Sequence, residues 1–144
     1  YNKIKWKRTY LIVIVCGFYL TFFTYLENYY THYSYDHSSW WQFGYLDAVA
    51  KTQELKNQNN NIYIDKSVEQ AYIFWLFGTK FDPKIYHQSG NKDHFDKFNF
   101  STQMPTNPND LFVTTANMLP DNFETLDTIN YPNGTTALNI GHPK

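Results

Sequence analysis

The hydrophobic and polar positions divide the chain into an uncharged N-terminal stretch and a longer, mixed remainder. Residues 9–26 (TYLIVIVCGFYLTFFTYL) form a run of 18 residues without a charged side chain. Such a run is at the short end of what crosses a hydrocarbon core of about 30 Å. Trp6 and Tyr10 lie at one end of it and Tyr25 and Tyr29 at the other, and amphipathic rings favour the two membrane interfaces. The pattern predicts a transmembrane helix at residues 9–26.

The charges around this run predict its orientation. Residues 1–8 carry four basic side chains and no acidic one, namely Lys3, Lys5, Lys7 and Arg8. From Glu27 onward the chain holds the other 8 basic residues and all 13 acidic ones. Because basic flanks stay on the cytoplasmic side, we expect residues 1–8 to be a cytoplasmic flank in the cell membrane and the C-terminal part to be extracytoplasmic. The lipid bilayer is therefore the first expected partner.

Two other interpretations of residues 9–26 stay open. A cleaved signal peptide has a similar basic and apolar pattern, but no small-x-small cleavage site follows, since the flank is Tyr, Glu and Asn. A buried core helix is the second, and Thr21 and Thr24 make the run less apolar than a leucine-rich span. Length and flanking residues favour the membrane helix over both. Cys16 is the single cysteine, so the sequence allows no disulfide within the chain.

The segment after the predicted membrane helix begins with a connector and continues as a helix. Residues 27–39 are a polar-aromatic connector without clear periodicity, expected at or just above the membrane interface, where Tyr is favoured. Ser39 followed three residues later by Gln42 is a capping-box pattern, and apolar positions then recur at helical spacing as far as Leu55. Gly44 inside that helix would cost about 1 kcal/mol relative to Ala, which suggests close packing or a bend.

A strand and a second helix are predicted next. Residues 62–66 (IYIDK) have the pattern of a short strand. Ser67 and Gln70 repeat the capping-box spacing, and residues 68–78 (VEQAYIFWLFG) form a helix that is apolar on nearly all sides, with Gly78 as its C-cap. We expect one face of this helix to cover a sheet and the other to meet the membrane or the first helix.

The remaining elements complete an α/β fold class. Residues 84–109 are loop-like, with one short irregular strand through Phe95, Phe98 and Phe100. Residues 110–115 are a strand, and residues 117–123 are a turn or one helical turn. Residues 124–141 are a hairpin around Asn133-Gly134. We therefore expect an extracytoplasmic α/β domain at residues 40–144, with about four strands, a C-terminal hairpin and two main helices. The step from residues 62–66 to residues 110–115 would join parallel strands by a right-handed connection.

Sequence motifs for catalysis, metal binding and nucleic-acid binding do not occur. The five histidines lack metal-ligand spacing, and phosphate-loop, dinucleotide and nucleophile-elbow motifs are missing. No metal and no cofactor are therefore expected. The outer residues are net acidic without a basic stripe, so no nucleic-acid partner is expected. The aromatic-polar strip from Tyr29 to Tyr45 suits carbohydrate or lipid head groups, although composition alone favours a membrane-interface belt followed by a helix start.

The order of several motifs resembles one enzyme family. The run THYSYDHSSWWQFGYLDAV is similar to the segment after the last transmembrane helix of bacterial dolichyl-phosphate-mannose protein mannosyltransferase-like enzymes, which have the multi-span GT-C architecture. Residues 62–83 resemble the family's strand and Asp-Gln-Pro-Tyr helix start, a pattern that Gln70 and Tyr72 keep and Glu69 and Ala71 do not. Residues 126–140 resemble its closing hairpin. The matching positions of the first motif are His32, Tyr33, Trp41, Gln42, Gly44 and Tyr45, with Phe43 in place of a Tyr.

The resemblance implies a function. It suggests the C-terminal part of a membrane glycosyltransferase, a hexosyltransferase that moves a sugar from a polyprenyl-phosphate carrier, with the outer domain capping the active-site cavity. The catalytic acid of such enzymes lies in the first external loop, outside these motifs, so no catalytic residue is assigned here. The expected partners are the polyprenyl-phosphate-linked sugar and the remaining transmembrane helices of the parent chain. The candidate substrate-binding residues are His32, Tyr33, Asp36, Trp41, Gln42, Tyr45 and Gln70. The alternative is a non-catalytic, membrane-anchored binding or assembly module.

Overall fold

The computed structural model describes residues 2–89, 93–116 and 118–144, with side chains from Trp6 onward. The chain is mixed α/β and divides into two compact units, Tyr1–Ser38 and Ser39–Lys144, which are described separately. The side chains of Lys3 and Lys5, on which the predicted orientation partly depends, lie outside the described residues. Asn117, the first residue of the predicted turn, also lies outside them.

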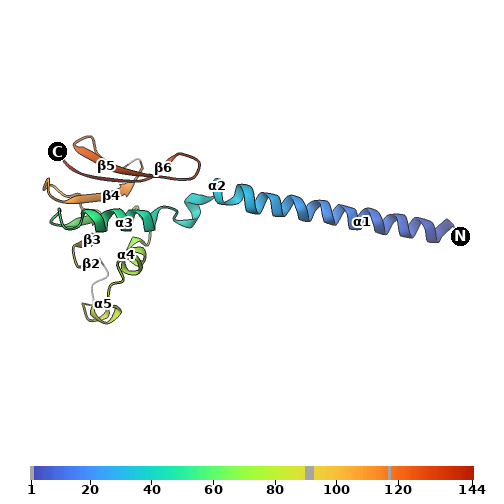
Figure 1. Ribbon diagram of the computed structural model, residues 1–144, viewed down its shortest axis with the longest axis horizontal. Helices are drawn as coiled ribbons and strands as arrows, with labels where there is room; N and C mark the ends of the chain where they lie inside the picture. Colours follow the sequence, from blue (N-terminus) through green and yellow to red (C-terminus); the bar gives the residue numbers. More distant parts are fainter. Residues whose placement is uncertain (1, 90–92, 117) are drawn as a thin grey trace. The chain divides into compact units, whose positions relative to one another are not determined.

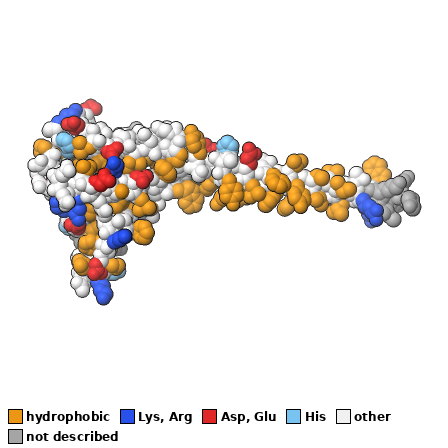
Figure 2. Space-filling model, in the orientation of Figure 1, with side chains coloured by type: hydrophobic (Ala, Val, Ile, Leu, Met, Phe, Trp, Pro, Cys, Tyr) orange, Lys and Arg blue, Asp and Glu red, His pale blue; other side chains and the backbone are white. Residues whose placement is uncertain are grey.

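The N-terminal unit is one continuous helical segment (Figure 1). The helix α1 (Asn2–Glu27) passes into the π-helix η1 (Asn28–Tyr33) and then into α2 (Ser34–Asp36). Among the described residues, the stretch Trp6–Asp36 is long and apolar enough to cross a membrane. Figure 2 shows hydrophobic side chains exposed along α1. The predicted span is thus confirmed as a candidate membrane helix, and its orientation stays a prediction.

The connector at residues 27–39 is more regular than its sequence pattern suggested. Tyr25, Tyr29 and Tyr33 stack at i, i+4 spacing, with successive ring centroids 6.0 and 5.7 Å apart. The ring of His37 lies 4.9 Å from that of Tyr33. Aromatic neighbours at this spacing stabilise a helix. Stacking of these side chains therefore explains why the helix continues through α2, although the hydrophobic periodicity of the sequence did not predict a helix there.

The second unit is built on one six-stranded sheet with the order β2-β3-β1-β4-β6-β5. Its strands are β1 (Ile62–Ile64), β2 (His94–Phe95), β3 (Phe98–Phe100), β4 (Leu111–Thr115), β5 (Phe123–Asn130) and β6 (Thr136–Pro143). β1 pairs in parallel with β3 and β4, so that Ile62 lies opposite Phe98 on one side and Leu111 on the other. The other pairings are antiparallel. The predicted parallel step is confirmed.

The sheet has more strands than the expected four because of a short hairpin within the predicted loop. β2 and β3 pair at Phe95 and Phe98, and Asp96, with φ 53°, adopts the left-handed conformation of a tight turn. The C-terminal hairpin is confirmed. β5 and β6 pair along their length, and Gly134 turns the chain with φ 83°. The single irregular strand predicted through Phe95, Phe98 and Phe100 is thus two strands, of two and three residues, on either side of this turn.

The helices of the second unit differ from their predicted boundaries. They are the 3₁₀ helix η2 (Ser38–Trp41), which joins the units, α3 (Tyr45–Leu55), α4 (Ala71–Thr79) and α5 (Pro83–Ser89). Neither capping-box prediction is correct. Gln42 and Gly44 have φ 51° and 85°, so the chain turns before α3 begins. Gln70, with φ 57°, precedes α4, and the Ser67 hydroxyl donates to the Asp65 carboxylate at 2.6 Å. α5 begins one residue before the predicted loop of residues 84–109 and otherwise lies within it.

Two glycines permit the close approach of elements. A Cβ on Gly44 would lie 2.7 Å from Cγ2 of Ile129, and one on Gly78 would lie 2.7 Å from Cγ1 of Val49. Gly44 therefore combines a bend with close packing, as the sequence suggested, but it lies before α3 and not within it. Gly78 lies inside α4 against α3, and Lys80, with φ 54°, forms the C-cap instead.

The core lies between the sheet and the helices α3 and α4. Trp75 is fully buried, and its indole N–H donates to the hydroxyl of buried Thr52 at 3.2 Å. Ile62, Ile64 and Leu111 are also fully buried. α4 buries only one of its faces in this core, because Ile73 and Phe77 are exposed although α4 is almost wholly apolar.

Candidate functional site

The carboxyl ends of three parallel strands meet at one edge of the sheet. β1 lies between β3 and β4 and runs parallel to both, so the chain leaves all three strands at the same edge. In open α/β sheets a ligand crevice forms at the carboxyl ends where neighbouring connections diverge to opposite sides. A cavity of about 230 Å³ lies at this edge. We call it the carboxyl-edge cleft.

One short segment supplies most of the lining of the carboxyl-edge cleft. The eight lining residues are Asp65, Lys66, Val68, Gln70, Ala71, Tyr72, Asp93 and Phe100. Six of them belong to the turn and helix start that follow β1 directly. The segment leaves a central strand, so the sheet fixes where it begins.

Hydrogen bonds hold the Asp65 carboxylate in place. Its Oδ2 accepts from the hydroxyls of Ser67, at 2.6 Å, and Thr114, at 3.5 Å. The Asp65 backbone N–H donates to the Val113 carbonyl at 2.9 Å, which ties the turn to β4. The Val68 N–H donates back to the Asp65 carbonyl at 2.9 Å and closes the turn. This carboxylate is therefore positioned before any ligand binds.

The other polar groups of the cleft carry charges and dipoles suited to a hydroxyl-rich ligand. Lys66 Nζ and Asp93 Oδ1 are 3.8 Å apart, and both side chains are mostly exposed, so their attraction contributes little stability. Gln70 is exposed and has φ 57°, an uncommon conformation for a residue with a side chain. Tyr72 is half-buried. Carboxylate, amide and ammonium groups beside an aromatic ring can bind sugar hydroxyls and stack on a sugar face.

Tyr45, predicted as a ligand-binding residue, lies in the core of the second unit. Its ring packs edge-to-face on Phe74 with centroids 5.1 Å apart, and its side chain is 9% exposed. Burial raises the pKa of the Tyr45 hydroxyl, with Tyr131 and Glu69 adding to the rise and a hydrogen bond donated by the Glu69 backbone N–H opposing it. Tyr45 thus supports the start of α4 beside Gln70, and its direct role in binding stays a prediction.

The other predicted site residues belong to different parts of the chain. Trp41 is 67% exposed at the end of η2, and Gln42 is half-buried in the turn before α3. His32, Tyr33 and Asp36 belong to the N-terminal unit, where Tyr33 is held by the stacked rings and the other two are exposed. Gln70 is the one predicted site residue that lines the carboxyl-edge cleft.

The sequence prediction missed most of the polar cleft residues. Asp65 and Lys66 directly follow a predicted strand in a parallel β–α–β step, which is the position where α/β sheets bind ligands. That signal was available. Asp93 was not recognisable, because it reaches the cleft only through the pairing of β2 and β3 at the edge of the sheet, which the predicted single irregular strand did not include.

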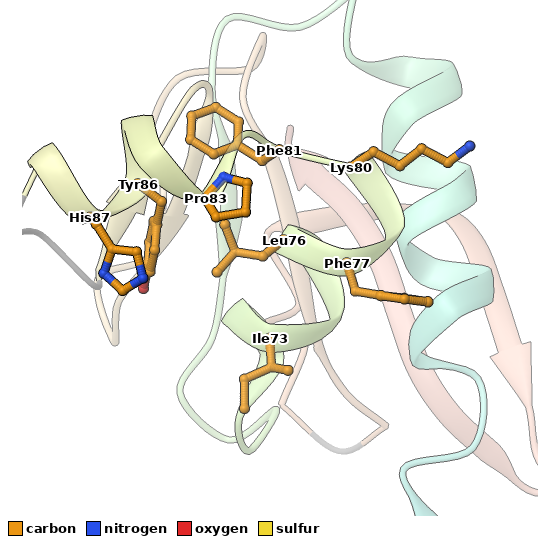
Figure 3. Close-up of a pocket in the computed structure, with 8 residues that line it drawn as sticks. All are labelled: Ile73, Leu76, Phe77, Lys80, Phe81, Pro83, Tyr86 and His87. Carbon is orange, nitrogen blue, oxygen red and sulfur yellow. The ribbon is translucent and has the colours of Figure 1, made fainter.

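A second, larger hollow lies between α4 and α5. It has a volume of about 620 Å³ and is lined by Ile73, Leu76, Phe77, Lys80, Phe81, Pro83, Tyr86 and His87. In Figure 3, Leu76 of α4 points toward Tyr86 and His87 of α5. We call this surface the α4–α5 hollow. Its lining is mainly apolar, so it is chemically distinct from the carboxyl-edge cleft.

Tyr86 lies close to both cavities. Its ring packs edge-to-face on Phe95 with centroids 5.9 Å apart. Its hydroxyl is buried and has no hydrogen-bond partner among the described residues. Burial raises the pKa of this hydroxyl, and Tyr72 and Asp93, which line the carboxyl-edge cleft, add to the rise. The two cavities are therefore neighbours along α4.

Comparison with protein-family models, curated proteins and solved structures finds no match to this chain. Within the described ranges, no three His, Cys, Asp or Glu side chains are grouped as metal ligands would be. What the site can do is therefore argued from its own residues.

Proposed function

We propose that this chain is the last membrane helix and extracytoplasmic domain of a membrane glycosyltransferase that moves a sugar from a polyprenyl-phosphate carrier. In this proposal the second unit caps the active-site cavity of the parent enzyme, and the carboxyl-edge cleft binds sugar hydroxyls of the donor or acceptor. The catalytic acid comes from another part of the enzyme, as the family resemblance implies. The residues of this chain bind and orient the substrate.

One observation carries the proposal. The segment from Asp65 to Tyr72 supplies six of the eight residues that line the carboxyl-edge cleft, and the same segment carries the helix-start motif that resembles the glycosyltransferases. Gln70 and Tyr72 keep the family pattern and both line the cleft. A candidate membrane helix in the same chain fits an enzyme whose donor is a lipid.

The chemistry of the cleft fits a neutral or phosphorylated sugar better than an apolar ligand. Asp65 and Asp93 accept hydrogen bonds from hydroxyls, and the Gln70 amide both donates and accepts. Lys66 supplies a cation for a sugar phosphate. The ring of Tyr72 offers a stacking face. Each polar group has a distinct task, and none has to act as an acid or base.

A transfer assay with the full enzyme tests the role of the cleft. Gln70→Gly removes the amide at a position whose φ of 57° glycine adopts without strain. We expect sugar transfer from the polyprenyl-phosphate donor to fall about fivefold, the effect of one lost hydrogen bond of about 1 kcal/mol. Gln88→Ala is the matched control, because Gln88 is exposed on α5 outside the cleft. Equal transfer by both variants and the wild type would refute the role of the cleft in sugar transfer.

Substitutions of the neighbouring Trp40 and Trp41 test whether the N-terminal motif binds substrate. The resemblance assigns Trp41 and His32 to substrate binding, and Trp40 has no such assignment, although it is as exposed as Trp41. Trp41→Ala should reduce transfer about fivefold through the loss of one stacked ring, and His32→Ala should also reduce it, with normal membrane insertion. Trp40→Ala should leave transfer unchanged. The same loss in the Trp40 and Trp41 variants would contradict this assignment.

A non-catalytic binding module is the second candidate function. The lining residues of the carboxyl-edge cleft and of the α4–α5 hollow form no recognisable catalytic motif, which is the feature that favours it. The two functions differ in one measurable respect. A binding module holds the sugar with the same cleft residues, but changing Gln70 leaves the rate of transfer by any associated enzyme unaltered.

A further inference from the structure

α4 exposes a large apolar surface that the core does not use. Ala71 and Trp75 are buried against the sheet, whereas Ile73 and Phe77, one turn apart, face outward. Phe77 is 74% exposed, and Ile85 of α5 is 55% exposed. Ile73 and Phe77 line the α4–α5 hollow, and exposed apolar surface of this kind marks an interaction site.

The charges near this patch are opposite in sign to those of the rest of the unit. From residue 71 to residue 89 the chain has Lys80 and Lys84 and one acid, Asp82, a net charge of +1. The whole of residues 39–144 has eight basic and eleven acidic side chains, a net charge of −3. Both lysines are exposed. The hollow is mainly apolar with Lys80 in its lining, and Lys84 follows its lining residue Pro83 on α5. It complements a surface that is apolar inside and anionic outside.

A lipid bilayer is the surface of this kind that is always near the second unit. The candidate membrane span ends at Asp36, and the second unit begins at Ser39. A compact unit of roughly 100 residues has a radius of gyration of about 13 Å. So short a connection tethers the second unit to the bilayer, and tethering gives the bilayer a high effective concentration. A separate protein partner would have no such advantage.

We propose that the α4–α5 hollow docks on the surface of an anionic lipid bilayer. Ile73 and Phe77 enter the boundary between head groups and acyl chains, about 5–10 Å deep, as amphipathic helices do. Lys80 and Lys84 extend their apolar stems along this boundary and place their ammonium groups among lipid phosphates. The proposal is independent of sugar transfer and holds for a binding module as well.

Depth measurement in nanodiscs tests the docking. The full chain with Cys16→Ser is labelled with an environment-sensitive dye at Phe77→Cys, or at Leu126→Cys as the matched control. Leu126 is an exposed leucine of β5 outside the hollow. In discs of phosphatidylcholine with phosphatidylglycerol, nitroxide lipids should quench the dye at position 77 and leave that at position 126 unquenched. Lys80→Glu and Lys84→Glu should each lower the docked-to-free ratio about fivefold.

Two results would overturn the proposal. Equal quenching at positions 77 and 126 would show that the hollow has no preference for lipid. The second result is a dye at position 77 that is shielded from water but not quenched by nitroxide lipid. If this shielding increases with protein concentration, the hollow binds a second copy of the chain. Loss of quenching in pure phosphatidylcholine, with retention in the anionic discs, would support it.

Discussion

The indole N–H of Trp75 donates a hydrogen bond to the hydroxyl of Thr52 across the contact between α4 and α3, and both side chains are completely buried. The same hydroxyl donates to the Val49 carbonyl at 3.0 Å within α3. This chain of bonds satisfies the polar atom of the largest core side chain. It fixes α4 against α3, and α4 in turn carries residues of both cavities.

Replacing Thr52 tests this bond. Thr52→Val keeps the shape of the side chain and leaves the Trp75 N–H buried without its acceptor, so the free energy of unfolding should fall by about 1–3 kcal/mol. Thr52→Ser keeps the hydroxyl and should retain most of the stability that the Val variant loses. Chemical unfolding in detergent, followed by tryptophan fluorescence, measures both. A Ser variant less stable than the Val variant would contradict the role of the hydroxyl.

Two glycines with the same backbone angle separate conformational strain from packing. Gly44 and Gly134 have φ 85° and 83°, but only a Cβ on Gly44 would meet another atom within 4 Å, namely Cγ2 of Ile129 at 2.7 Å. Gly134→Ala should lower the free energy of unfolding by roughly 1–2 kcal/mol through strain alone. Gly44→Ala should lower it by about 1–3 kcal/mol more through overpacking. Equal losses, measured by thermal unfolding, would show that Ile129 relaxes without cost.

The buried hydroxyl of Tyr86 predicts an effect of pH. Its pKa in the folded chain is raised above the unfolded value of about 10, so folding favours the protonated form. This contribution is fully present below pH about 10 and is lost as pH rises through the folded pKa. Tyr86→Phe should therefore make the alkaline loss of stability shallower. The alkaline loss of stability that remains in this variant reflects Tyr45, whose pKa is also raised.

The same substitution has an expected outcome at neutral pH. The Tyr86 hydroxyl has no hydrogen-bond partner among the described residues, so Tyr86→Phe should raise the free energy of unfolding by about 1 kcal/mol. Tyr45→Phe should not raise it, because the Tyr45 hydroxyl oxygen accepts a hydrogen bond from the Glu69 backbone N–H. Unfolding curves at pH 7 compare the two variants. Destabilisation by Tyr86→Phe would indicate that this hydroxyl has a partner.

Sequence reasoning succeeded where one signal dominated. The uncharged run at residues 9–26 and the Asn133-Gly134 turn each predicted an element that the structure contains. It failed where the chain turns through left-handed residues that carry side chains. The capping-box pattern predicted Gln42 and Gln70 inside the first turn of their helices. In the structure both have positive φ and precede their helices. A side chain that favours a helix start in isolation can be held in a turn by tertiary packing.

The candidate site was only partly predictable for a related reason. Gln70 was identified by resemblance, and Asp65 follows from the rule that parallel strands bind ligands at their carboxyl ends. Asp93 comes from a distant, loop-like segment that only the sheet brings to the cleft. Tyr45 belongs to the predicted motif but is buried. The predicted site therefore combined residues that are close in sequence but differ in exposure. It missed Asp93, which the strand topology brings to the cleft.

The most direct test of the proposed sugar-binding cleft is a ligand titration of the chain in nanodiscs, observed by amide NMR with a short-chain polyprenyl-phosphate hexose. Amide shifts should saturate and concentrate in residues 65–72, with the β5–β6 turn at residues 131–135 unmoved. Asp65→Asn and Tyr72→Ala should weaken binding by about fivefold each, the effect of one hydrogen bond or one stacked ring. Shifts absent from residues 65–72, or equal to those of the turn, would contradict the account.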